Sequence, residues 1–483
     1  MFIRLTLVLF ASLLAAARSD AHANIIIVPN DSPGTGLNDA TMVMPVAGNP
    51  GSTLGAQRLY VMQKAADQWG AMLESSVPIR VNAHWNMTTC NASTTSLGSA
   101  GAAAIFSNFS NAPRADTWYV AALADALAGV DLDPTAYDIN AQFNPLVDAG
   151  CIAGITGWWY GVDPAVAPPV DRIALLPVLL HEFAHALGFV SLTNASTGAY
   201  YGGAPGRPDT WAYFLRDTTT GLTWNAMTAA QRQASAINDP HLVWSGPNVN
   251  RVQRAYLRRA VQLSITAPAQ NAGDIASIAA TIGPPVSATG LAGEVVLVQD
   301  GVAAPGGSAN DACEALTNAA ALAGKIALID RGRCKSVDQL LRVQAAGAIG
   351  ALIANNTTGL AAVGGTGPLV IIPSLGITKA DGATLRNAQS PAVSMHPVAA
   401  LAGTQDGCVR MHAPSPIVSG VSVSHFSLEA TPNLLMEPSA DTQRLDQTDL
   451  TLALLQDIGW STHPGDLLFF DDFDPNPCAA ISP

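Results

Sequence analysis

The segment 181–185, with the sequence HEFAH, holds the residue types that could do chemistry. His181 and His185 lie four positions apart, so on a helix their imidazoles leave the same face one turn apart. Neutral imidazole nitrogen is a good ligand for Zn²⁺, and bound zinc lowers the pKa of a coordinated water to about 7. Glu182 follows the first histidine directly, so its carboxylate can act on that water as general base. The spacing predicts a zinc site in which Glu182 is the catalytic residue.

A buried helix over residues 173–190 is predicted to position this motif. Pro177 fits the first helical turn, where the missing N–H costs no hydrogen bond, and Gly188 fits the helix end. Most other positions near the motif are apolar, which favours burial of the site. The alternative is a surface helix on which the glutamate and the histidines pair with one another and bind no metal.

Elements on both sides of the motif indicate an α+β protein with more than one folded unit. Residues 54–73 repeat apolar side chains at helical spacing, and residues 77–84 alternate like a half-buried strand. Further helices are predicted over 337–346 and 447–458. Short apolar runs typical of strands are 295–298, 325–329, 349–354 and 369–372.

A catalytic zinc site needs a third protein ligand besides the two histidines. The run HEFAHALGF, residues 181–189, resembles the zinc helix of metzincin peptidases, in which a glycine at the place of Gly188 turns the chain. Metzincins usually carry their third histidine three residues beyond that glycine, where this chain has Ser191. Leishmanolysin-type metzincins share the HALGF ending, and their third histidine follows an inserted segment shortly before a turn that contains methionine.

The runs SHFS (424–427) and LLMEP (434–438) resemble that later part of leishmanolysin-type chains. The resemblance implies that His425 is the third zinc ligand and that Met436 is the Met-turn residue beneath the metal. Residues 445–460 resemble the C-terminal helix that packs behind the site. A gluzincin-type site, with a glutamate as third ligand, is the alternative, and its candidates are Glu294, Glu429 and Glu437.

Residues 265–402, between the two parts of this site, resemble the protease-associated (PA) domain. The resemblance rests on GKIALIDRGRC (324–334), on QAAGA (344–348), on a strand that ends at Asn355 and on IPSLGI (372–377), in this order. It implies an inserted, noncatalytic α/β domain that covers the site or helps to select substrates. It also implies a disulfide between Cys313 and Cys334.

The cysteine content fits an oxidising compartment, because the even number permits every thiol to pair. Sequence alone leaves the pairing open. Once Cys313 and Cys334 are joined, Cys90 with Cys151 and Cys408 with Cys478 is our guess for the rest. The six cysteines are Cys90, Cys151, Cys313, Cys334, Cys408 and Cys478.

The first 23 residues have the layout of a secretory signal peptide. Arg4 precedes an apolar run over 5–17, and Ala21-His22-Ala23 offers a small-x-small cleavage site. The alternative, a membrane anchor, is less favourable, because the run is shorter than the ~20 apolar residues that span a bilayer. We therefore predict a secreted protein, cleaved near Ala23, with no membrane span in the mature chain.

The charge balance bears on partners. The formal net charge of -13 argues against a nucleic-acid partner, and only 23 Lys and Arg residues occur in 483. The acidic tail, residues 466–483, contains Asp471, Asp472 and Asp474, which could hold Ca²⁺; a solvated tail is the alternative.

Together these features predict a secreted zinc metalloendopeptidase of metzincin-like α+β fold, a twisted sheet with a zinc-binding helix, interrupted by the PA domain. Its substrates would be proteins or peptides. The alternative is a catalytically silent secreted binding or adhesion protein that uses the PA domain. The predicted parts are the signal peptide (1–23), the catalytic domain (24–264 and 403–465), the PA domain (265–402) and the tail (466–483).

Overall fold

The computed structural model describes residues 22–87, 89–90, 96–152, 154–169, 171–203, 205–301, 307–361, 363–364, 369–438, 448–462 and 478. Almost all of the predicted signal peptide lies outside the described residues. So do the acidic tail apart from Cys478, its three aspartates Asp471, Asp472 and Asp474, and the start of the predicted run 445–460.

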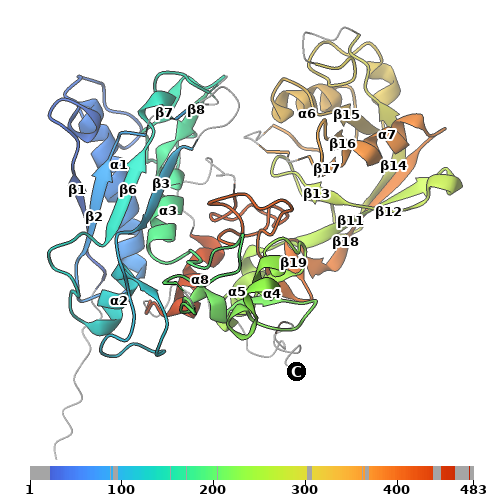
Figure 1. The fold of residues 1–483 in the computed structure, drawn as a ribbon. Helices are drawn as coiled ribbons and strands as arrows, with labels where there is room; N and C mark the ends of the chain where they lie inside the picture. The colour runs from blue at the N-terminus through green and yellow to red at the C-terminus, as the bar shows by residue number, and fades with distance from the viewer. Residues whose placement is uncertain are drawn as a thin grey trace, which may run out of the picture.

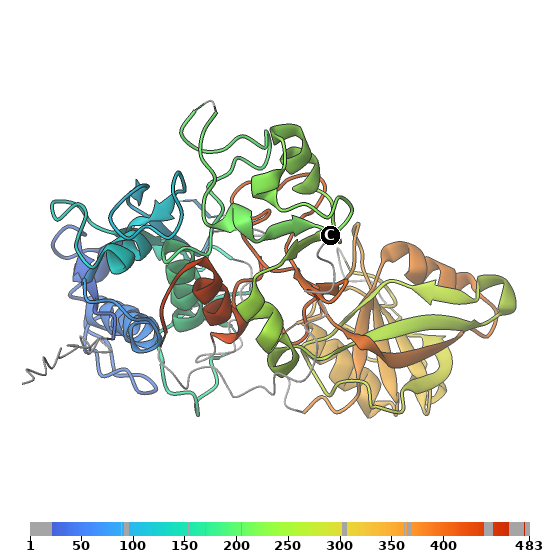
Figure 2. The same cartoon turned by 90° about the horizontal axis from the view of Figure 1, so that it is seen from below.

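The described chain forms three lobes (Figure 1). We call residues 22–190 the N-terminal lobe, residues 191–258 with 402–462 the central lobe, and residues 259–401 the distal lobe. The central lobe lies between the other two in both views (Figure 2). It is coloured green and red because it combines chain from before and after the distal lobe.

A four-stranded sheet forms the frame of the N-terminal lobe. Its order is β1 (Ile25–Pro29), β2 (Ile79–His84), β6 (Ile139–Phe143) and β3 (Gly98–Ala102). The first three strands are parallel, and β3 runs antiparallel to β6. Side chains of β2 alternate between buried and half-buried, as the sequence pattern predicted. Strand β3 is an edge of this sheet.

Two long helices, α1 (Leu54–Met72) and α3 (Leu175–Ala186), pack against each other. The hydroxyl of Thr53 accepts the N–H of Ala56 and caps the start of α1. Helix α3 packs against β3. Most of its side chains are apolar, so nearly all of them can be buried. It is shorter than the predicted 173–190 at both ends. The shorter helix α2 covers Ala121–Ala128.

The central lobe contains a small antiparallel sheet that both parts of the chain build. Strands β9 (Leu215–Asp217) and β10 (Leu242–Trp244) precede the distal lobe, whereas β19 (Thr404–Gln405) and β20 (Cys408–Arg410) follow it. Strand β10 pairs with both β9 and β20. The chain therefore returns from the distal lobe to the sheet that it left.

Three helices complete the central lobe: α4 (Ala229–Ser235), α5 (Pro247–Tyr256) and α8 (Asp449–Ile458). Helix α8 agrees with the helix predicted at 447–458. The carboxylate of Asp457 on α8 accepts the N–H of Asn248 at 2.8 Å, at the start of α5. This bond satisfies one of the free N–H groups at the helix end and ties the two helices together.

The distal lobe is built on an eight-stranded mixed sheet of order β12-β11-β18-β14-β15-β16-β17-β13. Strands β14 to β17 are parallel neighbours in this order, and α6 (Ser336–Ala345) and α7 (Lys379–Asn387) pack on them. The strands are β11 (Arg259–Ala267), β12 (Gly273–Ile275), β13 (Ser277–Ala279), β14 (Leu291–Leu297), β15 (Ile326–Asp330), β16 (Gly350–Ala354), β17 (Ser374–Ile377) and β18 (Ala392–Leu401).

One sequence prediction for this lobe is wrong. Residues 369–372 form no strand, and Leu369 and Ile371 are each 71% exposed. The strand begins later, at Ser374, because the residues from Ser374 to Ile377 are the ones that pair with β16. An apolar run forms a strand only where a neighbouring strand accepts its backbone hydrogen bonds.

Two long antiparallel strands attach the distal lobe. Strands β11 and β18 pair from Arg259 with Leu401 to Ala267 with Ala392. The insertion thus leaves and re-enters the central lobe at neighbouring positions, which is how an inserted domain leaves its host intact. The paired strands begin at Arg259, before the predicted start at 265.

Three disulfides join the cysteines in the pairs Cys90–Cys151, Cys313–Cys334 and Cys408–Cys478. Cys313–Cys334 is the pair that the PA-domain resemblance implied, and the other two pairs agree with our guess. Within the described ranges, the chain contains no helix long and apolar enough to cross a bilayer.

Candidate metal centre

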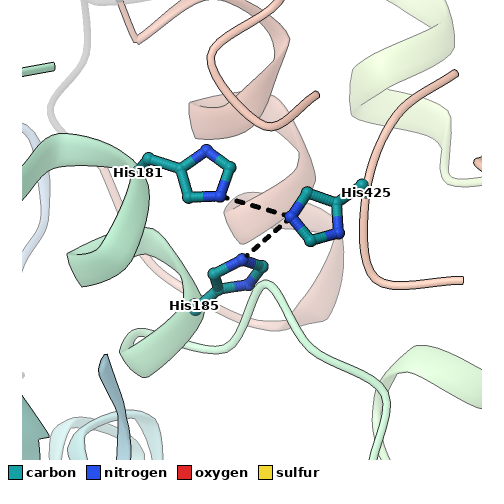
Figure 3. Close-up of side chains that lie close together, drawn as sticks. All are labelled: His181, His185 and His425. Atoms are coloured by element: carbon teal, nitrogen blue, oxygen red, sulfur yellow. Dashed lines mark hydrogen bonds between the residues drawn. The ribbon is translucent and has the colours of Figure 1, made fainter. Parts of the chain in front are cut away.

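Three imidazoles from distant parts of the chain converge between the N-terminal and central lobes (Figure 3). His181 and His185 extend from α3, and His425 comes from the segment that follows β20. The Nε2 atom of His425 lies 3.3 Å from the Nε2 atoms of both other histidines. The dashed lines of Figure 3 mark these two contacts.

The opposite nitrogen of each ring faces a backbone carbonyl. A carbonyl oxygen only accepts, so each Nδ1 must carry the proton and donate it. Each Nε2 is then left with a lone pair that points to the common centre. The carbonyls belong to Leu435, Phe189 and Val421, at 2.7, 2.7 and 2.8 Å from His181, His185 and His425 respectively.

This arrangement fits Zn²⁺. Tetrahedral ligation at ~2.0–2.1 Å from zinc to nitrogen separates two ligand atoms by roughly 3.3 Å. The two Nε2 separations have that value. Three lone pairs this close repel one another unless a cation lies between them. Burial lowers the pKa of all three imidazoles, that of His425 to about 3, so they stay in the neutral form that binds metal.

Glu182 lines the same cavity as the three histidines. Its Oε2 atom accepts the N–H of Ala100 on the edge strand β3 at 3.1 Å. Burial raises the pKa of Glu182 to about 7, although the bond from Ala100 acts in the opposite direction. The carboxylate is therefore held at a fixed place between the helix and the edge strand.

Gly188 makes the turn that orients His185. Its φ of 121° is one that other residues rarely adopt, and a Cβ there would lie 2.6 Å from Cδ1 of Ile458. The turn lets Phe189 donate its N–H back to Ala184 at 2.9 Å. The carbonyl of Phe189 then faces the imidazole of His185. The structure thus shows a positional need for the glycine that the sequence pattern singled out.

The turn that contains Met436 braces both parts of the candidate centre. Met436 is fully buried, and its carbonyl accepts the N–H of Phe426, the residue after His425, at 2.8 Å. The preceding residue, Leu435, holds the ring of His181 through its carbonyl. This turn therefore positions one ligand from each segment.

Asp209 is a positioning residue that sequence analysis missed. It is 2% exposed, and its carboxylate accepts the hydroxyl of Ser191 at 3.2 Å and the N–H of Thr193 at 3.1 Å. The N–H of Ser191 in turn donates to the hydroxyl of Ser424 at 3.1 Å, next to His425. Position 191, where most metzincins have a histidine, thus links the end of α3 to the segment of the distant histidine. A single aspartate in a loop gives no sequence signal for this role.

A cavity of about 1000 Å³ opens over the three histidines. Strand β3 lines one side of it, and the segments 190–196 and 417–425 line another. Since β3 is a sheet edge, part of its backbone faces this cavity.

The glutamates considered as alternative third ligands lie elsewhere in the described structure. Glu294 pairs with Lys325 in the distal lobe at 2.6 Å, and Glu429 pairs with Arg410. Glu437 uses its Oε1 to accept the N–H of Leu434 at 2.9 Å. Among the described residues, the potential ligand that joins His181 and His185 is His425.

Comparison with protein families identifies the inserted domain. The family model of the PA domain matches residues 291–385. The chain therefore contains a PA domain within an overall α+β structure, as the sequence predicted. The search of curated proteins returned no match.

Solved structures of peptidases resemble part of the chain. A zinc aminopeptidase from Bacillus subtilis is 21% identical over 39% of this chain and 41% of that chain, with a TM-score of 0.23. An aminopeptidase from Aneurinibacillus sp. is 26% identical over 30% and 32%, with a TM-score of 0.22. A peptidase M28 precursor from Shewanella amazonensis is 18% identical over 29% and 34%, with a TM-score of 0.21. The match spans about two fifths of the first of these proteins, and at such scores the likeness carries no argument about activity.

Proposed function

We propose that the protein is a secreted zinc metalloendopeptidase. The observation that carries this proposal is the convergence of three imidazole lone pairs in a cavity that Glu182 also lines. Three nitrogen ligands with a neighbouring carboxylate form the donor set of catalytic, rather than structural, zinc sites, because one coordination position stays open.

In this proposal His181, His185 and His425 hold the metal. A zinc ion held there would supply Lewis acidity for a bound water and for the scissile carbonyl. Glu182 takes the proton of the attacking water and passes it to the leaving amine. The N–H of Ala100 keeps the carboxylate of Glu182 directed to the cavity.

The position of the edge strand β3 is an argument for a polypeptide substrate. It pairs with β6 on one side, whereas the N–H of Ala100 points away from β6 to Glu182. Backbone groups on this side of β3 are placed to bind an extended peptide by adding a strand to the sheet. An extended peptide held along β3 would cross the space above the three histidines, which suits cleavage within a chain.

Several features favour the metzincin type. Gly188 turns the chain after the second histidine. In the turn at Met436, the carbonyl of Leu435 accepts a hydrogen bond from His181 and that of Met436 accepts one from Phe426. We infer that the catalytic domain, predicted as 24–264 and 403–465, is interrupted at the start of β11, Arg259, and that the inserted lobe with its PA domain helps to select protein substrates. The three disulfides support an oxidising, extracellular location.

The substitution Glu182→Gln tests the proposal. It removes the base but keeps side-chain size, so the variant should retain zinc at the wild-type ratio and lose about 10²–10⁴-fold in peptide cleavage. Zinc content after dialysis and cleavage of an internally quenched peptide are the two measurements. Zinc binding without cleavage by the wild type would instead favour a silent binding protein. Equal cleavage by both proteins would exclude Glu182 as base.

A further inference from the structure

A second group of potential metal ligands lies in the distal lobe, far along the chain from the histidines. Asp300 follows strand β14, and Asp311 and Glu314 lie on either side of Cys313, which forms a disulfide with Cys334. One carboxylate oxygen from each of the three acids lies within 4.8 Å of the others. Asp300 is 4% exposed and Asp311 is 1% exposed.

Backbone hydrogen bonds hold two of these carboxylates side by side. The N–H of Cys313 donates both to Oδ2 of Asp300 and to Oδ1 of Asp311, each at 3.0 Å. The side chain of Cys313 is fixed by its disulfide bond to Cys334. The loop also packs closely on the following turn, because a Cβ at Gly332 would lie 2.6 Å from Cβ of Asp311. The acids are therefore brought together by the fold of the loop.

One oxygen of this group lacks a hydrogen-bond donor within the described part of the chain. Oδ1 of Asp300 is buried and receives no hydrogen bond from the described residues. A buried carboxylate oxygen without a donor, beside two more acids, is costly unless a proton or a cation neutralises it.

We propose that Asp300, Asp311 and Glu314 bind one Ca²⁺ ion in the distal lobe. Carboxylate oxygens are ligands of hard cations, whereas zinc in proteins favours sites with histidine or cysteine. Calcium binds oxygen at 2.3–2.6 Å, so oxygens on opposite sides of the ion are about 4.8 Å apart. The three acids can therefore surround one such ion, and water can complete its coordination.

This site is independent of the proposed peptidase activity. It shares no residue with the candidate zinc centre or with the acidic tail. A bound ion would join the end of β14 to the disulfide loop, and this gives calcium a structural effect on the distal lobe. The effect should appear as stability against unfolding, because an ion that binds only the folded lobe stabilises it by mass action.

The test uses the full-length protein with its zinc content held constant. Thermal unfolding is followed while CaCl₂ is added to calcium-free protein, and MgCl₂ is added in a parallel titration. The wild type is compared with Glu314→Gln, which removes one carboxylate at a half-buried position. The matched control is Glu294→Gln, which removes an acid of the same lobe that pairs with Lys325 outside the group.

We expect Ca²⁺ to raise the Tm of the wild type and of Glu294→Gln by several degrees. In Glu314→Gln the calcium concentration for half of this rise should increase at least tenfold. Mg²⁺ should act far more weakly, since it demands six close ligands in octahedral order. Tb³⁺ luminescence provides a second measurement of binding. The wild type and Glu294→Gln should bind Tb³⁺ with similar affinity, and Glu314→Gln should bind it more weakly.

Three results would overturn the proposal. An unchanged Tm of the wild type with up to ~10 mM Ca²⁺ would mean that no such ion binds; a shared proton between Glu314 and Asp300 would then neutralise the group. An equal calcium response of Glu314→Gln and the wild type would place the ion elsewhere in the chain. An equal response to Mg²⁺ would contradict the assignment of calcium.

Discussion

The candidate zinc centre and the acidic group of the distal lobe assemble metal-ligand side chains in opposite ways. The histidines come from α3 and from a segment 240 positions further along the chain, at residue 425. The three acids lie within one stretch, 300–314, that a single disulfide fastens to the next turn. The histidine centre therefore depends on how two lobes pack, whereas the acidic group depends on one loop.

The two regions also differ in how their ligands are oriented. Every imidazole donates its Nδ1 proton to a carbonyl, so each lone pair has one direction. In the acidic group, Oδ1 of Asp300 has no such partner among the described residues. Pre-orientation of ligands is what makes a metal site tight and geometrically selective. We expect changes in packing to weaken zinc binding and to leave the distal lobe unaffected.

The largest expected effect comes from His425→Ala, which removes the ligand that joins the two segments. Peptide cleavage should fall by at least about 10³-fold and zinc should be lost on dialysis, because two imidazoles alone leave the ion weakly bound. Cleavage assays and metal analysis measure both. The calcium response of the distal lobe should stay the same. Retention of zinc by this variant would exclude His425 as a ligand.

The next effect concerns Gly188→Ala. The residue has a φ of 121°, and an added Cβ would lie 2.6 Å from Cδ1 of Ile458. The substitution should therefore cost about 2–3 kcal/mol and shift the carbonyl that holds His185. Denaturant unfolding and zinc affinity are the measurements. Gly129→Ala is the matched control, because Gly129 has a φ of 71° with open space at its Cβ. It should cost about 1 kcal/mol and leave zinc affinity unchanged. Equal effects of both variants on zinc would contradict the role of the turn.

A smaller effect is expected for Asp209→Asn. Loss of the carboxylate weakens the link from Ser191 to the segment of His425, so zinc affinity should fall about 10–100-fold. A competition titration with a zinc chelator measures it. The control is Asp217→Asn, a buried aspartate of the same lobe that accepts the N–H of Thr219. Both variants should lower Tm. If the control variant also lost zinc, the effect would come from general destabilisation of the lobe and not from loss of the link between Asp209 and the segment of His425.

The smallest effect is a pH dependence from Asp457. Burial raises its pKa from 3.8 to about 6, so the folded state holds this proton more tightly than the unfolded state does. Its contribution to the free energy of unfolding is then greatest below pH ~4 and falls by about 2 kcal/mol as the pH rises to ~6. Asp457→Asn should flatten this part of the profile, as measured by urea unfolding. An unchanged slope would show that the carboxyl titrates normally.

Local sequence patterns predicted the parts of the centre that depend on neighbours in the chain. The spacing of His181 and His185 requires only a helix, and the turn at Gly188 requires only a residue that tolerates a positive φ. The runs of the PA domain were likewise recognisable, and the family match at 291–385 confirms that domain. Local patterns failed at 369–372, because the apolar run there predicts a strand but no neighbouring strand of the described structure pairs with it.

His425 was predicted from a family resemblance and not from physical reasoning on the residues. Nothing near position 425 specifies that its ring meets α3. The carbonyls of Leu435 and Val421, the loop held by Asp209 and the orphaned oxygen of Asp300 had no sequence signal either. The contacts of Leu435, Val421 and Asp209 depend on backbone atoms, which every residue type carries alike. The position of the Asp300 oxygen depends on how its loop packs.

The amino-acid pattern decided the type of chemistry, because side-chain identity and helical spacing set which atoms can bind a metal and which can accept a proton. Tertiary structure alone decided which distant histidine lies beside His181 and His185 and which nitrogen of each ring faces the common centre. The reason is that ligand direction comes from hydrogen bonds to carbonyls of remote segments, and those segments meet only when the two lobes pack together.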